Sequence, residues 1–417
     1  MTAIGHAPVP GVVMVRVLHD GVWYPATEVA DGAAYELFSD EPYVGASSAE
    51  ILLNPRPDIP HRYRRFVHVN DVAAVSGRSA RSQEAPLYAR VSTELSWSAL
   101  YRMSQAPASE ESPIGAVRCT AVVRRGTRMM KVLSARQLGG YLTGWLPSGF
   151  CYREYDVAHL RTPTALSALR SDDTPTGDVA FALRWRAVDP IDYEIPFTSA
   201  EAYGGLLEMP SQERLGPRVI GSGFAPTDRY LIPEFVTTDL ADVPLTANAS
   251  LVAYTPDGTE VTLYAYLAEQ RAWTRTFGKQ WRHLLAEVPT GPEGPFPITT
   301  AYLPVEPGLS RFIGQYGGGL YEAVADPPAG FWPLVNTRAD PHPLDRLARR
   351  TAYGSWRGAA CTVVRVDGDW LRLRLCRPDD ESVARLRARC VERGVYEVWA
   401  PTEQVSDCRP VDVEYRL

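Results

Sequence analysis

The sequence lacks the motifs on which several classes of site depend. Its six cysteines form no C-x-x-C pair, which argues against a zinc ribbon or a dithiol redox site. Its seven histidines include no i, i+4 pair and no H-E-x-x-H motif, so a zinc enzyme is not indicated. The glycine motifs of P-loop and dinucleotide-binding folds are absent, as is the G-x-S-x-G motif of hydrolases. We therefore expect no metal site and no bound cofactor.

The sequence also lacks excess positive charge and long apolar runs. The net charge of −6 provides no general attraction for nucleic acid or for an anionic membrane surface. No run approaches the ~18 apolar residues of a membrane span, and the N-terminus has neither the basic start nor the apolar core of a signal peptide. We expect a cytoplasmic protein with reduced thiols and with no nucleic-acid or membrane partner. Only Lys131 and Lys279 are lysines, which a GC-rich coding bias explains.

The residues that are present predict an α+β, β-rich chain of several small modules. A length of 417 residues suggests two to four domains, and 45% hydrophobic residues suffice for real cores. The 32 glycines and 35 prolines favour short strands and many turns over long helices. We divide the chain into a barrel-like module (1–78), a mixed segment (87–200), an α+β domain (201–335) and a C-terminal module with one helix (350–417).

Both ends of the chain show short apolar runs separated by Asp-Gly turns, which is typical of hairpins. Near the N-terminus the turns are Asp20-Gly21 and Asp31-Gly32, and near the C-terminus the turn is Asp367-Gly368. The pattern predicts SH3-like barrels at both ends. In the C-terminal module a helix is expected from residue 379, with Val383, Leu386 and Cys390 on its inner face and Gly394 after its end.

The middle of the chain contains three predicted elements with clear local signals. Pro256-Asp257-Gly258 predicts a hairpin that joins strands 251–255 and 261–267. Thr162 before Pro163 predicts an N-capped helix over 163–169. A further helix is expected over 273–285.

The segment with the most backbone freedom is Gly314-Gln-Tyr-Gly-Gly-Gly319, preceded by Leu303-Pro-Val-Glu-Pro-Gly308. Consecutive glycines reach positive φ freely and let backbone N–H groups face a ligand. Gln315, which both donates and accepts hydrogen bonds, is the functional side chain set among them.

The Gly314–Gly319 segment and its lead-in resemble the glycine-rich loop of the tuberculosis necrotizing toxin family of NAD⁺ glycohydrolases, over about residues 225–325. The resemblance implies that Gln315 and His283 are catalytic and that Arg229, in Asp228-Arg-Tyr-Leu-Ile-Pro233, binds phosphate. It also implies NAD⁺ as the substrate, without a metal or cofactor. Remaining contacts to NAD⁺ would come from the glycines and from aromatic rings that stack on a base: Gly317, Gly318, Gly319, Tyr316 and Phe312. Tyr316 stands where the family has proline.

Other readings of the same residues stay open. The glycines could form a simple turn between two strands, Arg229 could be a surface arginine, and His283 could be a partly buried structural residue. Arg90 and Glu194 show a weaker similarity to the arginine strand and acidic partner of ADP-ribosyltransferases. The alternative function is a non-catalytic interaction protein, such as an immunity or assembly factor, because 10 Trp and 21 Tyr are available for binding surfaces.

Overall fold

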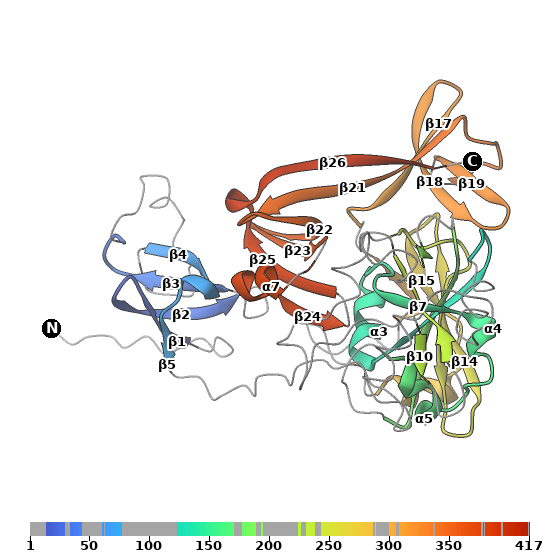
Figure 1. Ribbon diagram of the computed structural model, residues 1–417, viewed down its shortest axis with the longest axis horizontal. Helices are drawn as coiled ribbons and strands as arrows, with labels where there is room; N and C mark the ends of the chain where they lie inside the picture. Colours follow the sequence, from blue (N-terminus) through green and yellow to red (C-terminus); the bar gives the residue numbers. More distant parts are fainter. Residues whose placement is uncertain are drawn as a thin grey trace, which may run out of the picture. The chain divides into compact units, whose positions relative to one another are not determined.

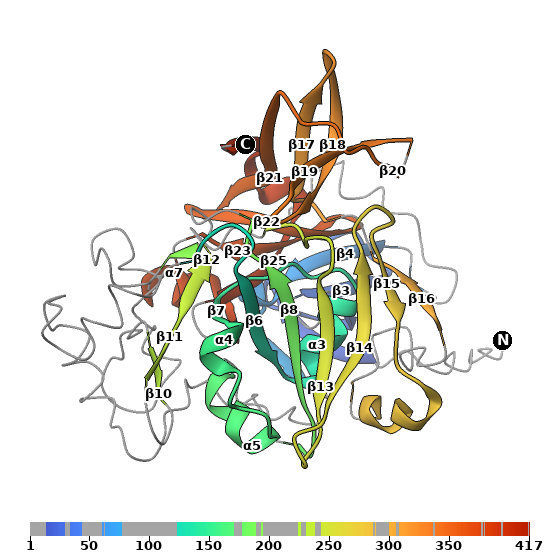
Figure 2. The same cartoon turned by 90° about the vertical axis from the view of Figure 1, so that its right-hand side faces the viewer.

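The computed structural model confirms a β-rich α+β chain, with 54% of the described residues in strands and 14% in helices. Antiparallel sheets make up most of it (Figures 1 and 2). The structure describes residues 14–29, 34–43, 61, 63–76, 123–170, 177–188, 193–194, 224–226, 231–237, 243–286, 288, 300–305, 308–336, 338–376, 378, 380–392, 395–415 and 417. The boundary between the first two predicted segments, residues 79–86, lies outside them.

The chain divides into two compact units. Unit 1 comprises Met1–Ala85 with Val366–Leu373 and Val398–Val405, and unit 2 comprises Pro86–Arg365, Arg374–Glu397 and Ser406–Leu417. The C-terminal residues are therefore shared between the units.

Unit 1 contains a five-stranded antiparallel meander, which we call the N-terminal module. Its strand order is β4-β3-β2-β1-β5, so the last strand returns to pair with the first. Val17, Tyr24, Tyr35 and Leu37 fill its interior. The elements are β1 (Met14–His19), β2 (Val22–Val29), β3 (Ala34–Ser39), β4 (Tyr63–His68), the 3₁₀ turn η3 (Val69–Asp71) and β5 (Ala74–Ser76).

An aromatic cluster within unit 1 joins this module to two C-terminal segments. Trp370 meets the ring of Phe66 edge-on, with centroids 6.2 Å apart, and the ring of His68 at 6.5 Å. Ala34 is fully buried in the same cluster beside Trp399. We call this contact the seam.

The core of unit 2 is a nine-stranded antiparallel sheet in the order β16-β15-β14-β13-β8-β6-β7-β12-β9. Strands from 87–200 and from 201–335 pair directly, because β8 lies between β6 and β13. The two predicted segments therefore build one sheet. Its strands are β6 (Arg128–Leu133), β7 (Phe150–Arg153), β8 (Ala180–Arg186), β9 (Tyr193–Glu194), β12 (Phe235–Thr237), β13 (Ser250–Tyr254), β14 (Glu260–Leu267), β15 (Ala272–Arg275) and β16 (Tyr302–Pro304); β10 (Phe224–Pro226) and β11 (Leu231–Pro233) form a separate pair.

Helices cover both faces of this sheet because alternate residues of its strands point to opposite sides. Met129 packs with helix α3 (Ala135–Leu142) in one core, and the next residue, Met130, packs in the other core with the short helices α4 (Glu154–Val157) and α5 (Pro163–Leu166). The predicted cap of the 163–169 helix is confirmed: Thr162 Oγ1 accepts a hydrogen bond from the Ala165 N–H.

The C-terminal strands begin with a meander, β17 (Arg311–Tyr316), β18 (Gly319–Asp326), β19 (Gly330–Val335) and β20 (Arg338–Ala339), which is joined through β17 to the long strand β21 (Arg346–Trp356). From β21 onward the order β25-β23-β22-β21-β26 repeats the order of the N-terminal module. We call these strands the C-terminal module: β21, β22 (Ala359–Asp367), β23 (Trp370–Leu375), β25 (Val395–Pro401) and β26 (Ser406–Tyr415), with the 3₁₀ turn η9 (Thr402–Gln404) before the last strand.

Two predicted helices differ from the structure. Residues 273–285 form β15 and then a 3₁₀ segment, η8 (Lys279–Leu285), because Trp273 is fully buried in the sheet between β14 and β16. The C-terminal helix α7 (Asp380–Leu386) ends early at Arg387, whose φ is +49°. Val383 and Leu386 are buried as predicted, but Cys390 lies on strand β24 (Arg389–Glu392).

Candidate functional site

The glycine-rich segment is the tip of a β-hairpin. Strands β17 and β18 pair in register up to Tyr316 and Gly319, which leaves a two-residue turn of Gly317 and Gly318. Both turn residues have positive φ, at 54° and 80°, which is the conformation of a type I′ turn. A Cβ added to either would meet no atom within 4 Å, so the backbone conformation alone requires glycine there.

The flanking glycines are in close contact with side chains, which would have to move to admit a Cβ. A Cβ on Gly314 would lie 2.6 Å from both methyl carbons of Leu344, and one on Gly319 would lie 2.7 Å from the ring of Tyr321. Two glycines therefore serve the turn and two serve close contacts. The hairpin accounts for the whole glycine pattern, which is the turn between strands that the sequence left open.

Gln315 lies one residue before the end of β17, opposite Leu320 on β18 and Arg346 on β21. Its carbonyl oxygen accepts a hydrogen bond from the Asp345 N–H at 2.8 Å. The side chain is half-buried. Because side chains alternate along a strand, Gln315 and Leu320 share the face of the hairpin that is opposite to Phe312.

The two faces of the hairpin have different surroundings. Phe312 is 1% exposed, with its ring 5.4 Å from Phe331 and 5.5 Å from Tyr415, so neither face of the ring is left for a base. Tyr316, on the same face near the turn, stacks on His342 with centroids 5.5 Å apart and 7° between the planes. On the opposite face Leu320 is 73% exposed, and it does not belong to the core cluster that contains Phe312.

The other predicted site residues are not gathered at the hairpin. His283 is exposed on η8, with its Nδ1 2.9 Å from the carbonyl oxygen of Gln280. In Figure 2 the gold η8 lies at the lower edge of unit 2 and the tip of β17 and β18 at the upper edge. Arg229 and Arg90 lie outside the described residues, and the backbone of Glu194 belongs to β9.

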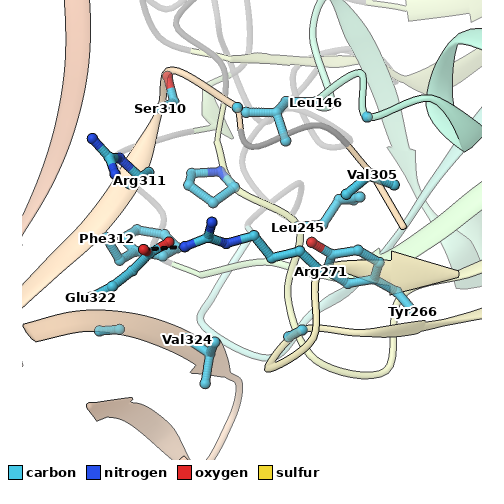
Figure 3. A pocket seen from close by; sticks show the side chains of 15 residues that line it. Leu146, Leu245, Tyr266, Arg271, Val305, Ser310, Arg311, Phe312, Glu322 and Val324 are labelled. Carbon is cyan, nitrogen blue, oxygen red and sulfur yellow. Dashed lines mark ion pairs between the residues drawn. The ribbon is translucent and has the colours of Figure 1, made fainter. Parts of the chain in front are cut away.

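A small cavity of about 50 Å³ lies at the base of the hairpin (Figure 3). Tyr266 of β14 and Arg271 of the turn after it form one wall, and Phe312 and Glu322 of the hairpin form another. This volume holds a few water molecules, whereas pockets for ligands of nucleotide size measure about 300–1,000 Å³. Gln315, Tyr316 and His283 do not line it.

An ion pair between Arg271 and Glu322 crosses this cavity and ties the sheet to the hairpin. Arg271 has a φ of +47° in the turn between β14 and β15. Burial raises the pKa of Tyr266 to about 12, so its hydroxyl stays protonated at neutral pH. The ion pair fixes the hairpin on the sheet. The cavity was missed in the sequence because its walls come from separate segments between Gly144 and Val324.

A buried polar network lies elsewhere in unit 2. Lys131 Nζ donates to Glu392 Oε2 at 2.6 Å and to the Phe150 carbonyl oxygen at 3.1 Å. Gln137 and Ser148 donate to the same carboxylate, at 3.4 and 3.3 Å. The side chains of Lys131 and Glu392 are 1% and 5% exposed, so no substrate reaches them. Lys131 was a detectable signal, since it is one of only two lysines in the chain and stands between Met130 and Val132 in an apolar run.

The thiols are also in buried surroundings. Burial raises the pKa of Cys151 to about 12, with the nearby Lys131 opposing the shift and Glu392 adding to it. Burial likewise raises the pKa of Cys361 to about 12. Neither thiol is a nucleophile near neutral pH. The five described cysteines form no disulfide bond, and four of them are buried, while Cys408 is exposed.

Within the described ranges, no cluster of three or more His, Cys, Asp or Glu residues could hold a metal ion. No helix in the same ranges has the length and apolar character needed to cross a membrane. Comparison with known proteins found no family model, no curated protein and no solved structure that matches the chain.

Proposed function

We propose that this chain is a non-catalytic interaction protein that presents surfaces of its β-modules to a protein partner. The observation that carries the proposal is the hairpin of β17 and β18. On β18, just after the type I′ turn, the side chain of Leu320 is 73% exposed. Immunity and assembly factors work in this way, through surfaces and without turnover. The repeated five-stranded module adds support, because it supplies further surfaces of the same kind.

The hairpin is suited to binding because its conformation is fixed before a partner arrives. Its base is anchored to the sheet by the Arg271–Glu322 pair and by a hydrogen bond from the Ala247 N–H to the Ala325 carbonyl oxygen at 2.7 Å. A preformed apolar tip loses little conformational entropy on association, which leaves more of the contact energy as affinity. Gln315, opposite Leu320, would provide a polar contact at the same surface.

The test compares two exposed leucines of the same unit. Purified wild-type protein, Leu320→Ser and Leu267→Ser would be immobilised and exposed to extract of the producing cells, and bound proteins would be quantified by mass spectrometry. Leu267 on β14 is 38% exposed and is the matched control. We expect one protein that wild type and Leu267→Ser retain and Leu320→Ser loses, confirmed with the purified pair. Identical profiles for all three proteins would contradict the proposal.

NAD⁺ glycohydrolase activity is the second candidate, supported by the half-buried Gln315 beside the turn and by the Tyr316 ring near it. Its test is the release of nicotinamide from NAD⁺ by wild type and by Gln315→Ala. Turnover that the variant loses would establish the enzyme and overturn the non-catalytic proposal. Absence of turnover, or equal turnover in both proteins, would remove this candidate.

A further inference from the structure

The outward face of the N-terminal module carries an apolar strip. On β1 and β2, Leu18 pairs with Trp23 and Arg16 pairs with Pro25, and Met14 follows on the same side of β1. These side chains alternate with the interior residues of the module, so they point away from its core. We call Met14, Leu18, Trp23 and Pro25, together with Arg16, the outer strip.

The outer strip is open to solvent. At its two ends, the large apolar side chains of Met14 and Trp23 are 40% and 39% exposed. Arg16 is exposed, with its guanidinium carbon 6.0 Å from the centre of the Trp23 ring. Arg16 is the only one of the five strip residues that carries a formal charge.

The C-terminal module shows that the scaffold does not require this strip. In both modules a type I′ turn joins the first two strands, Asp20-Gly21 in one and Arg357-Gly358 in the other. Counting from these turns, the positions of Leu18 and Trp23 are occupied by Ser355 and Ala360. An equivalent strand pair therefore folds with small residues where the N-terminal module has a half-buried leucine and an exposed tryptophan.

The strip ends where the seam begins. Along the outward side of β2, exposure falls from Trp23 at 39% to Thr27 at 6%, and Val29 packs on the seam cluster. The seam thus covers one half of the outward side of β2 and leaves the Trp23 half uncovered. Packing within unit 1 therefore explains the apolar side chain at Val29, but not the one at Trp23.

We propose that the outer strip docks an apolar segment of a partner protein that carries a carboxylate. A tryptophan flanked by aliphatic side chains supplies the desolvated contact area typical of binding hot spots. Arg16 over the Trp23 ring supplies one cation that can pair bidentately with Asp or Glu. The proposal rests on the interaction function for its class, but it concerns a surface separate from the hairpin.

The test uses a phage-displayed library of random 12-residue peptides, selected on the full-length protein. Enriched peptides are expected to combine two or more apolar side chains with an Asp or Glu. Their affinity, measured by fluorescence anisotropy of the labelled peptide, should fall tenfold or more in Trp23→Ser. Arg16→Glu should shift the preference to peptides with Lys or Arg. Ala360→Ser, at the equivalent position of the C-terminal module, should bind as wild type does.

Several outcomes would overturn the proposal: selection of basic peptides by wild type, binding unaffected by Trp23→Ser, or no Trp23-dependent binder at all. A dimer that Trp23→Ser dissociates would assign the strip to a second copy of the chain instead. Should Trp23→Ser fail to fold, Arg16→Glu at its exposed position still decides the charge preference. Leu320→Ser should bind the peptides normally, so a failure of the hairpin function is distinguishable from a failure here.

Discussion

The N-terminal and C-terminal modules share one scaffold but attach to the rest of the chain differently. Both follow the same strand order, with the last strand beside the first. Both join strands one and two through a type I′ turn, and both place a 3₁₀ turn, η3 or η9, before the last strand. The two modules share their strand order and turns, and they differ in the residues that contact the rest of the chain or the solvent.

The C-terminal module contains an insertion that contacts the nine-stranded sheet. Helix α7 and strand β24 stand between its third and fourth main strands, and β24 carries Glu392 to Lys131 of the nine-stranded sheet. The N-terminal module instead has the outer strip. One copy of the scaffold is thus fixed to the central sheet by a buried ion pair, while the other keeps an apolar face available for binding.

The largest effect is expected from breaking the buried anchor of the insertion. Glu392→Ala leaves the Lys131 ammonium buried without its carboxylate, which should lower the free energy of unfolding by about 3–5 kcal/mol. Guanidinium denaturation measures this loss. The double variant Lys131→Met/Glu392→Leu should recover most of it, because apolar replacement of both partners removes the uncompensated charge.

The N-terminal module provides the control for this anchor. Glu36 is buried there, but its partner Arg64, whose Nη1 lies 3.0 Å away, is 25% exposed. Glu36→Ala should therefore cost less than Glu392→Ala, since water reaches the cation that remains. Equal losses would show that the insertion anchor is not special.

The next effect tests the seam. Trp370 is 6% exposed between Phe66 and His68, so Trp370→Ala should lower the free energy of unfolding by about 3 kcal/mol, the low end for a buried tryptophan. The same substitution should increase amide hydrogen exchange in β3 and β4 of the N-terminal module. Unchanged exchange there would mean that the N-terminal module does not depend on the seam.

A smaller effect tests whether the two turns are equivalent. Gly21 and Gly358 have φ values of 76° and 81°, and replacing either by alanine should cost about 1–2 kcal/mol because an L side chain is strained there. No atom lies within 4 Å of a Cβ on Gly21, and only the Arg385 guanidinium lies near one on Gly358. Denaturation midpoints of the two variants should shift by similar amounts. A large difference between them would break the equivalence.

These turns also show what could be predicted from the sequence. Local signals were sufficient where the chain determines its own conformation: Asp20-Gly21, Pro256-Asp257-Gly258 and the Thr162 cap all appear as predicted. They were insufficient where distant strands compete. The sequence predicted a helix over 273–285, yet Trp273 lies in β15 and is buried between β14 and β16.

The candidate site was harder to predict for the same reason. A glycine that meets Leu344 thirty residues later is indistinguishable in sequence from a glycine that approaches a ligand. The buried Lys131–Glu392 pair joins residues 261 positions apart, and no local pattern reports its partner. The outer strip could not be predicted, because the alternation of side chains separates the two faces of a strand but does not tell which face is covered by other segments.

The smallest effect on stability is expected from moving the outer strip between modules. Ser355→Leu/Ala360→Trp places the strip residues on the C-terminal module, where Ala360 is exposed and Ser355 is half-buried. Surface changes of this kind usually alter stability by no more than about 0.5 kcal/mol. Tyr353→Arg is added to the graft to supply the cation at the position equivalent to Arg16. In a Trp23→Ser background, the graft should restore part of the binding to the selected acidic peptides, as measured by fluorescence anisotropy. A graft that is stable yet does not bind would show that the register alone is not enough, and that neighbours of Trp23 outside the two strands contribute to recognition.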